Sequence, residues 1–216
     1  MITIILLNQK LWLDGLDGII PGGVSVMDFS KVINADKNAA RKILEEMARN
    51  HIGRFDGEVM EFNDGDKIKA VMFALEKGIQ IDEAAEHLDW KDFEGLTAQI
   101  LDLKDFAIIR NLILTNPRME IDVVGIKFGV AMLIDCKHWK RHSQSALEKA
   151  VLKQVERTKQ YVAKTKGAIA APAIVTLYQD KVSFINNVPI VPIFQFASFV
   201  DEFYGNLEDI ETIRTE

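Results

Sequence analysis

Two aspartates and a lysine in the middle of the chain have the types and spacing best suited to chemistry. Residues 118–141 read as two apolar strands joined by a tight turn, with Asp122 on the first strand and Asp135 and Lys137 closing the second. Because side chains alternate faces along a strand, Asp135 and Lys137 project from the same side, and the antiparallel partner can carry Asp122 alongside them. Two carboxylates and an ammonium at one sheet edge suit a divalent cation held between the carboxylates, with the lysine beside an attacking water.

This pattern resembles the PD-(D/E)xK signature of restriction-endonuclease-like nucleases, in the branch of archaeal Holliday-junction resolvases and Mrr-type restriction proteins. The resemblance runs from about residue 88 to 204 and includes the polar strand ends, a helix before the hairpin and a basic helix after it. It departs at Ile121, where the signature has proline. The resemblance implies Mg²⁺ or Mn²⁺ as the cofactor, held by Asp122, Asp135 and the backbone carbonyl of Cys136.

A glutamate on the preceding helix is a further candidate ligand. Residues 90–104 repeat apolar side chains at a helical period, and Glu94 lies near the start of that helix, after Phe93. The resembled branch has such a Phe-Glu pair, which implies Glu94 as a direct or outer ligand of the metal. The alternative is an acid favoured in the first helical turn by the helix dipole. Glu120 shares a strand face with Asp122 and is the alternative ligand there, but the spacing in the family favours Asp122.

The helix after the hairpin is unusually basic. From residue 137 to 166 there are nine lysines and arginines against two glutamates, in a chain of net charge −6. Such a stripe beside a metal site suits the phosphates of DNA, although a solvated helix face is the general alternative. Gln154 matches a glutamine that the resembled families place near the active site, and a plain surface residue is its alternative. The residues expected to contact DNA in this region are Lys140, Arg141, Lys149, Lys153, Gln154 and Arg157.

The order of elements predicts an α/β fold. After the basic helix, residues 171–177 and 188–193 form apolar, β-rich runs, and residues 194–204 resume a helical period. Together with the hairpin, this order predicts a restriction-endonuclease-like mixed sheet flanked by helices over residues 89–216.

The N-terminal part predicts a different, mainly helical domain. Residues 26–88 read as a winged helix-turn-helix with bridging helices, in which Asp36 caps a helix over 37–50, and residues 1–25 read as a docking segment. Because residues 1–89 hold ten basic and sixteen acidic side chains, binding to protein is an equal alternative to binding DNA. The residues offered to a major groove are Lys37, Asn38 and Arg41.

Composition argues against several other classes. The chain has one cysteine, its four histidines lack HxH or HExxH spacing, and it has no GxxxxGK loop for nucleotide phosphates. The apolar run at residues 2–7 is far shorter than the roughly 20 residues that span a bilayer. We therefore expect a cytoplasmic protein with no membrane partner.

These patterns together predict a metal-dependent DNA endonuclease, in which Lys137 assists the water that attacks the phosphodiester. A non-cleaving DNA-binding or regulatory protein on the same fold is the alternative from another class, and RNA cleavage is a third. Duplex and branched DNA both fit the motif. A homodimer is compatible with the resemblance, because related enzymes cut two strands with paired sites.

Overall fold

A computed structural model gives the structure of the chain. It describes residues 2–139, 143–177 and 182–214. For residues 2–8 it describes the backbone alone. Lys140 and Arg141, both predicted to contact DNA, lie outside the described residues. Within the described part of the chain, no helix is long and apolar enough to cross a membrane.

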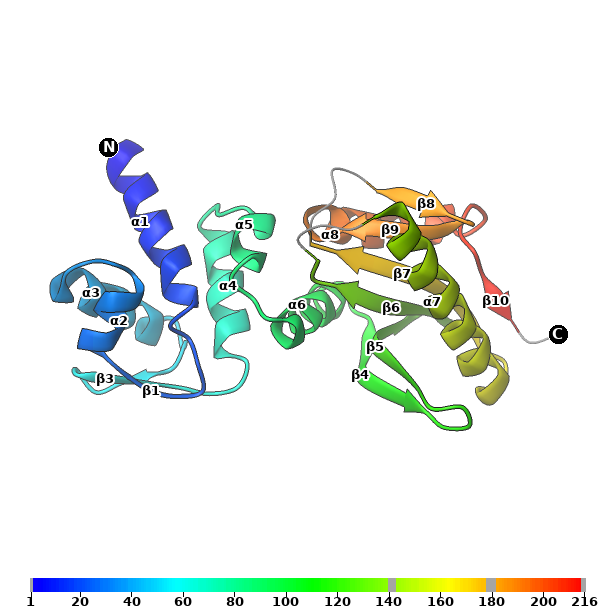
Figure 1. Ribbon diagram of the computed structural model, residues 1–216, viewed down its shortest axis with the longest axis horizontal. Helices are drawn as coiled ribbons and strands as arrows, with labels where there is room; N and C mark the ends of the chain where they lie inside the picture. The colour runs from blue at the N-terminus through cyan, green and yellow to red at the C-terminus, as the bar shows by residue number, and fades with distance from the viewer. Residues whose placement is uncertain (1, 140–142, 178–181, 215–216) are drawn as a thin grey trace. The chain divides into compact units, whose positions relative to one another are not determined.

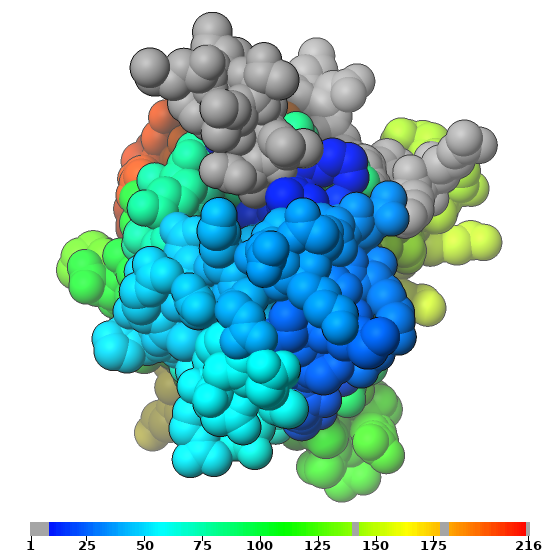
Figure 2. Space-filling model, turned by 90° about the vertical axis from the view of Figure 1, so that its left-hand side faces the viewer, coloured from blue at the N-terminus to red at the C-terminus, as the bar shows by residue number. Residues whose placement is uncertain are grey.

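The first of two compact units comprises residues 1–92 and is mainly helical (Figure 1). Its helices are α1 (Ile2–Leu16), α2 (Val26–Val32), α3 (Lys37–Arg49), α4 (Asp66–Glu76) and α5 (Ile81–Ala85). Its strands are β1 (Gly22–Ser25), β2 (Arg54–Phe55) and β3 (Val59–Phe62), in the sheet order β1-β3-β2. A two-helix hairpin, α2–α3, is thus followed by a two-stranded wing, β2–β3. Figure 2 faces this unit and shows its helices and wing, blue to cyan, as one continuous surface.

Local capping explains where the helices of this unit begin. The Asp36 carboxylate accepts hydrogen bonds from the backbone N–H groups of Asn38 and Ala39, at 2.8 and 2.9 Å, and α3 starts at the next residue as predicted. Helix α5 begins after its N-cap residue Gln80, and Asp82 lies inside its first turn.

Residues 1–25, predicted as a docking segment, are part of this unit. Strand β1 pairs antiparallel with β3, with Val24 opposite Met60. On α1, Trp12 is buried, its indole N–H donates to the Ala70 carbonyl at 3.3 Å, and its ring lies 4.9 Å from that of Phe73. Trp12 therefore packs within the first unit.

The second compact unit, residues 93–216, is built on a seven-stranded mixed sheet. Its helices are α6 (Trp90–Asp102), which begins before the boundary, α7 (Gln144–Lys164), α8 (Ile193–Glu202) and the short 3₁₀ helix η1 (Phe203–Asn206). Its strands are β4 (Ala107–Leu114), β5 (Met119–Lys127), β6 (Val130–Lys137), β7 (Ile169–Thr176), β8 (Ser183–Ile185), β9 (Val188–Pro192) and β10 (Ile213–Arg214). The strand order is β4-β5-β6-β7-β9-β8, with β10 paired to β7.

The strand directions make this a mixed sheet, as predicted. Strands β4, β5 and β6 form an antiparallel meander, whereas β6, β7 and β9 run parallel. A parallel pair needs a crossover, and α7 supplies it between β6 and β7. Figure 1 shows α7 in front of the sheet and α8 behind it. The predicted α/β fold class, a mixed sheet flanked by helices after a small mainly helical domain, is therefore confirmed.

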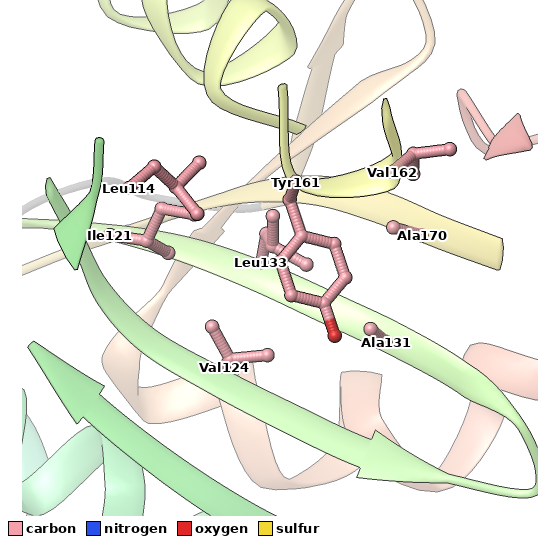
Figure 3. Close-up of a cluster of buried hydrophobic side chains, with 8 residues drawn as sticks. All are labelled: Leu114, Ile121, Val124, Ala131, Leu133, Tyr161, Val162 and Ala170. Atoms are coloured by element: carbon pink, nitrogen blue, oxygen red, sulfur yellow. The ribbon is translucent and has the colours of Figure 1, made fainter. Parts of the chain in front are cut away.

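One face of the sheet packs against α7. Ser143 caps this helix by accepting a hydrogen bond from the backbone N–H of Ala146. Its buried residues recur at the helical spacing that a sheet-facing stripe requires: Leu147, Ala150, Val151, Gln154, Thr158, Tyr161 and Val162. Figure 3 shows one buried hydrophobic cluster, which includes two residues of this helix and is formed by Leu114, Ile121, Val124, Ala131, Leu133, Tyr161, Val162 and Ala170.

The opposite face packs against α6. Consecutive residues of β6 reveal this arrangement, because Asp135 contacts Arg157 on α7 whereas the Cys136 sulfur lies 3.6 Å from the Thr97 hydroxyl on α6. The helix approaches β5 closely at Gly125, where an added Cβ would lie only 2.9 Å from a Leu101 methyl carbon.

This close contact predicts a packing effect at Gly125. Valine there would force α6 away from β5, and overpacking of this kind costs about 1 to 3 kcal/mol. We expect Gly125→Val to lower the urea midpoint measured by circular dichroism. The control is Gly205→Ala, since a Cβ at Gly205 would meet no atom within 4 Å. Equal midpoints for the two variants would contradict the close packing of α6 on β5.

Candidate active site

Strands β5 and β6 bring the two predicted aspartates side by side. The last pair of their ladder is Val123 opposite Ile134, so Asp122 and Asp135 are the next residues of the two strands beyond that pair. The backbone N–H of Cys136 donates to Asp122 Oδ2 at 2.7 Å and holds this carboxylate where the ladder ends. This hydrogen bond places the Asp122 carboxylate next to the end of β6, where Asp135 lies.

Asp135 is a buried carboxylate with a cation on each oxygen. Its exposed fraction is 2%. Oδ1 accepts a hydrogen bond from Arg157 Nη1 at 2.7 Å, and Lys137 Nζ lies 2.6 Å from Oδ2. Despite that short ion pair, Oδ2 accepts no hydrogen bond of good geometry from the residues that the structure describes. A carboxylate is tolerated at this depth because it is paired, since an isolated buried charge is very costly.

Glu94 and Asp122, the other two carboxylates of the candidate site, have less positive charge around them than Asp135. Glu94 is buried on α6, and its pKa is raised to about 7, first by burial and then by the negative charge of Asp122, with Arg110 acting in the opposite direction. Burial, followed by the charge of Asp135, raises the pKa of Asp122 to about 6. These shifts show that the carboxylates share one region, because each carboxylate makes ionisation of its neighbour harder.

Glu120, the alternative ligand, is an exposed residue two positions before Asp122. It pairs with Ile113 on β4 within the regular part of the β4–β5 ladder. Asp122 is the residue that reaches the end of β6, so the structure favours Asp122 over Glu120 as the partner of Asp135.

Cys136 enters the site through its backbone. Its thiol faces Thr97, and burial raises its pKa well above the usual value, which argues against a thiolate nucleophile. Its N–H points toward β5, where it meets Asp122. In an antiparallel pair the N–H and C=O of one residue point to the same neighbouring strand, so the Cys136 carbonyl is directed to that side as well.

The donor set fits magnesium better than a metal that needs an all-protein cage. Among the described residues, no three histidine, cysteine, aspartate or glutamate side chains are grouped closely enough to hold a metal ion. Magnesium usually takes one or two carboxylates and completes its octahedron with waters and substrate phosphates. Asp122, Asp135 and the Cys136 carbonyl offer oxygen ligands of this kind, with Glu94 as a direct or outer partner.

Three residues predicted to contact DNA have other partners in the structure. Gln154 is fully buried, and Arg157 is paired with Asp135. In the first unit, the Arg41 guanidinium donates to the Gly57 carbonyl and pairs with Glu58 at 2.7 Å, which ties α3 to the wing. Each of these side chains is thus held by the protein itself, and among them only Gln154 is withdrawn from the surface. Lys149, Lys153, Lys37 and Asn38 are exposed, as expected of residues that meet a ligand.

The sequence reasoning missed a distortion next to Asp122. The β4–β5 ladder pairs Arg110 with Val123 and Leu112 with Ile121, but the intervening pair, Asn111 and Asp122, is absent. Asn111 has a φ of 51°, in the left-handed region that breaks a regular ladder. Asparagine tolerates this conformation, so an asparagine within an apolar strand was the available signal. The distortion frees the backbone around Asp122 from β4 at the candidate site.

Comparisons with known proteins do not identify the chain. No family model matches it, and no curated protein matches it. Among solved structures it is similar to protein VC1899 from Vibrio cholerae, at 14% identity and a TM-score of 0.43. That match covers 94% of this chain, which spans 57% of the length of the Vibrio cholerae protein.

The raised pKa of Glu94 predicts how stability depends on pH. Its pKa of about 7 in the folded state lies above its ordinary 4.5, so the folded state binds the proton more tightly. The free energy of unfolding should therefore fall as the pH rises between these values, by at most about 3 kcal/mol from this group. We expect Glu94→Gln to remove much of that fall in urea unfolding at pH 5 and pH 8 without added metal. The exposed Glu208→Gln is the control, and an unchanged pH dependence in Glu94→Gln would show that Glu94 ionises normally.

Proposed function

We propose that the chain is a metal-dependent DNA endonuclease of the PD-(D/E)xK type, which hydrolyses phosphodiester bonds. The observation that carries the proposal is the contact at the end of the β5–β6 ladder, where the backbone N–H of Cys136 donates to Asp122 and the neighbouring Asp135 is paired with Lys137. Glu94 adds a third carboxylate to the same region. An arrangement that concentrates carboxylates beside an ammonium at a strand end suits hydrolysis of a phosphate ester.

The residues would divide the chemistry between them. Asp122, Asp135 and the Cys136 carbonyl would hold Mg²⁺ or Mn²⁺, with Glu94 as a direct or outer partner. A cation bound there supplies Lewis-acid chemistry, which lowers the pKa of a water and offsets charge on the phosphate. Lys137 would orient the attacking water and stabilise the charge that develops on the phosphate oxygens. The new P–O bond forms as the bond to the 3′ oxygen breaks, which leaves a 5′-phosphate and a 3′-hydroxyl.

Helix α7 supports the assignment of DNA as substrate. Its inner face delivers Arg157 to Asp135, while Lys149 and Lys153 are exposed at a spacing of one helical turn. One helix therefore carries both a contact to the candidate site and a cationic surface. Phosphate contacts from such side chains supply much of the affinity of proteins for DNA, and they make it sensitive to salt.

One observation favours a second candidate, a DNA-binding protein that does not cut. Asp135 already has both Lys137 and Arg157 as counterions, so its charge is balanced by the protein. A site of this kind is stable without a metal, as a purely structural ion-pair cluster would be. The two candidates differ in one measurable property, which is metal-dependent cleavage.

Substitutions in the site should separate the two candidates. Asp135→Asn keeps the size of the side chain but removes its charge, and Lys137→Ala removes the ammonium. We expect each variant to lose at least about a hundredfold in cleavage of labelled duplex or branched DNA with Mg²⁺, because several kcal/mol of transition-state stabilisation is lost. Both should still bind DNA in EDTA, and melting curves should show that they are folded.

The matched controls are Asp105→Asn and Lys159→Ala, which change exposed residues outside the candidate site. Cleavage by the wild type that persists in EDTA, or that is equal in all variants, would reject the metal mechanism. Absence of cleavage of any DNA or RNA by the wild type with Mg²⁺ or Mn²⁺ would favour the binding protein.

The exposed lysines of α7 allow a separate test of DNA binding. We expect Lys149→Glu with Lys153→Glu to weaken binding in EDTA and to reduce the slope of log affinity against log salt by about 2, since each lost phosphate contact removes about 0.9. The control with the same net charge is Lys31→Glu with Lys77→Glu, both in the first unit. If the control changes the slope as much as the α7 variant, DNA does not bind along α7.

A further inference from the structure

Arg157 is held in a closed set of hydrogen bonds with strand β6. Its Nη1 donates to Asp135 Oδ1 at 2.7 Å and to Gln154 Oε1 at 3.2 Å. Gln154 is fully buried, and its Nε2 donates to the Leu133 carbonyl at 2.8 Å. Leu133 and Asp135 are two residues apart on the same strand. The hydrogen bonds therefore connect Leu133 of β6 to Gln154, Gln154 to Arg157, and Arg157 to Asp135. Asp135 is the next residue of β6 on the same face as Leu133.

This set restricts the orientation of the Asp135 carboxylate. Gln154 cannot turn without leaving polar groups unpaired in the interior, and such groups are costly. With Gln154 fixed, Arg157 Nη1 lies between two acceptors, Gln154 Oε1 and Asp135 Oδ1, which set the direction from which it reaches Oδ1. Oδ1 is thereby engaged, and Oδ2 is the oxygen that faces Lys137.

The partly hidden position of Arg157 agrees with this role. Its side chain is 23% exposed, whereas Lys149 and Lys153 on the same helix are exposed. A planar guanidinium suits an acceptor pair of fixed geometry, while an ammonium on a flexible stem does not hold such directions. The structure therefore gives Arg157 a task that depends on geometry as well as on charge.

We propose that Arg157 is a positioning residue for Asp135, which presents Oδ2 to a divalent cation, and that it does not act as a DNA contact. This inference rests on the proposed function. Hydrogen-bonding partners that orient a metal ligand typically change metal affinity about 10- to 100-fold when they are removed. Arg157 would act on the metal site through its hydrogen bond to Asp135 Oδ1.

The experiment compares Mn²⁺ binding by calorimetry in the wild-type full chain, Arg157→Gln, Arg157→Lys and the control Lys153→Gln. We expect Arg157→Gln to weaken Mn²⁺ binding at least about tenfold. A weakening of Mn²⁺ binding is diagnostic, because loss of a positive charge near the cation would by itself strengthen Mn²⁺ binding. Arg157→Lys keeps the charge but lacks the planar fork, so we expect it to weaken Mn²⁺ binding to an intermediate degree. It also carries the test if the neutral variant does not fold.

DNA binding in EDTA supplies the second measurement. We expect Arg157→Gln to keep the affinity and salt dependence of the wild type, whereas Lys153→Gln weakens DNA binding and leaves Mn²⁺ affinity unchanged. Mn²⁺ affinity in Arg157→Gln that equals or exceeds that of the wild type would overturn the positioning role alone, as would a loss of DNA binding like that of the control. A wild type that neither binds Mn²⁺ nor cuts nucleic acid would instead overturn the proposed function, and this inference with it.

Discussion

The Asp135 carboxylate lies almost completely buried in the second unit, and a charge at that depth must be compensated by the protein. Two cations from different elements provide this compensation. Lys137 comes from the same strand, whereas Arg157 comes from α7, across 22 positions of sequence. The crossover helix must therefore lie over β6 in one rotation about its axis. Its buried glutamine holds that rotation through the hydrogen bond to Leu133. The packing of α7 on the sheet and the charge compensation of Asp135 thus depend on the same contacts.

Positive charge is distributed unevenly among the three carboxylates of the site. Both cations pair with Asp135, whereas at Glu94 and Asp122 burial and like charge outweigh the nearby positive charges and raise the pKa values to about 7 and about 6. One side of the cluster is therefore balanced and the other is short of positive charge near neutral pH. The missing Asn111–Asp122 pair opens the backbone on the same side. A small cation with oxygen ligands would relieve the deficit, which is why we regard hydrolysis assisted by Mg²⁺ as the function that this geometry best supports.

Ion pairing also decides which basic side chains are available to a ligand. Arg41 and Arg157 both sit on helices that sequence reasoning assigned to DNA, and both are bound by the protein instead. An arginine can satisfy several acceptors of fixed geometry, so it is readily recruited into such contacts, whereas lysines such as Lys149 and Lys153 extend into solvent. For this reason, counting basic residues along a helix overestimates its cationic surface. In the first unit, acidic side chains outnumber basic ones, so a count of its basic residues alone does not indicate a cationic surface.

Features that depend on neighbours in the chain could be predicted from the sequence alone. The cap at Asp36, the shared face of Asp135 and Lys137 and the α/β order of elements follow from backbone geometry over a few residues. The sequence did not reveal the partner of Arg157, because a residue at the margin of a helical stripe turns inward or outward according to the strand beneath it. The burial of Glu94 and the place of residues 1–25 within the first unit were likewise decided by tertiary contacts. Local geometry sets the direction of a side chain, but the packing of distant elements determines what that side chain meets.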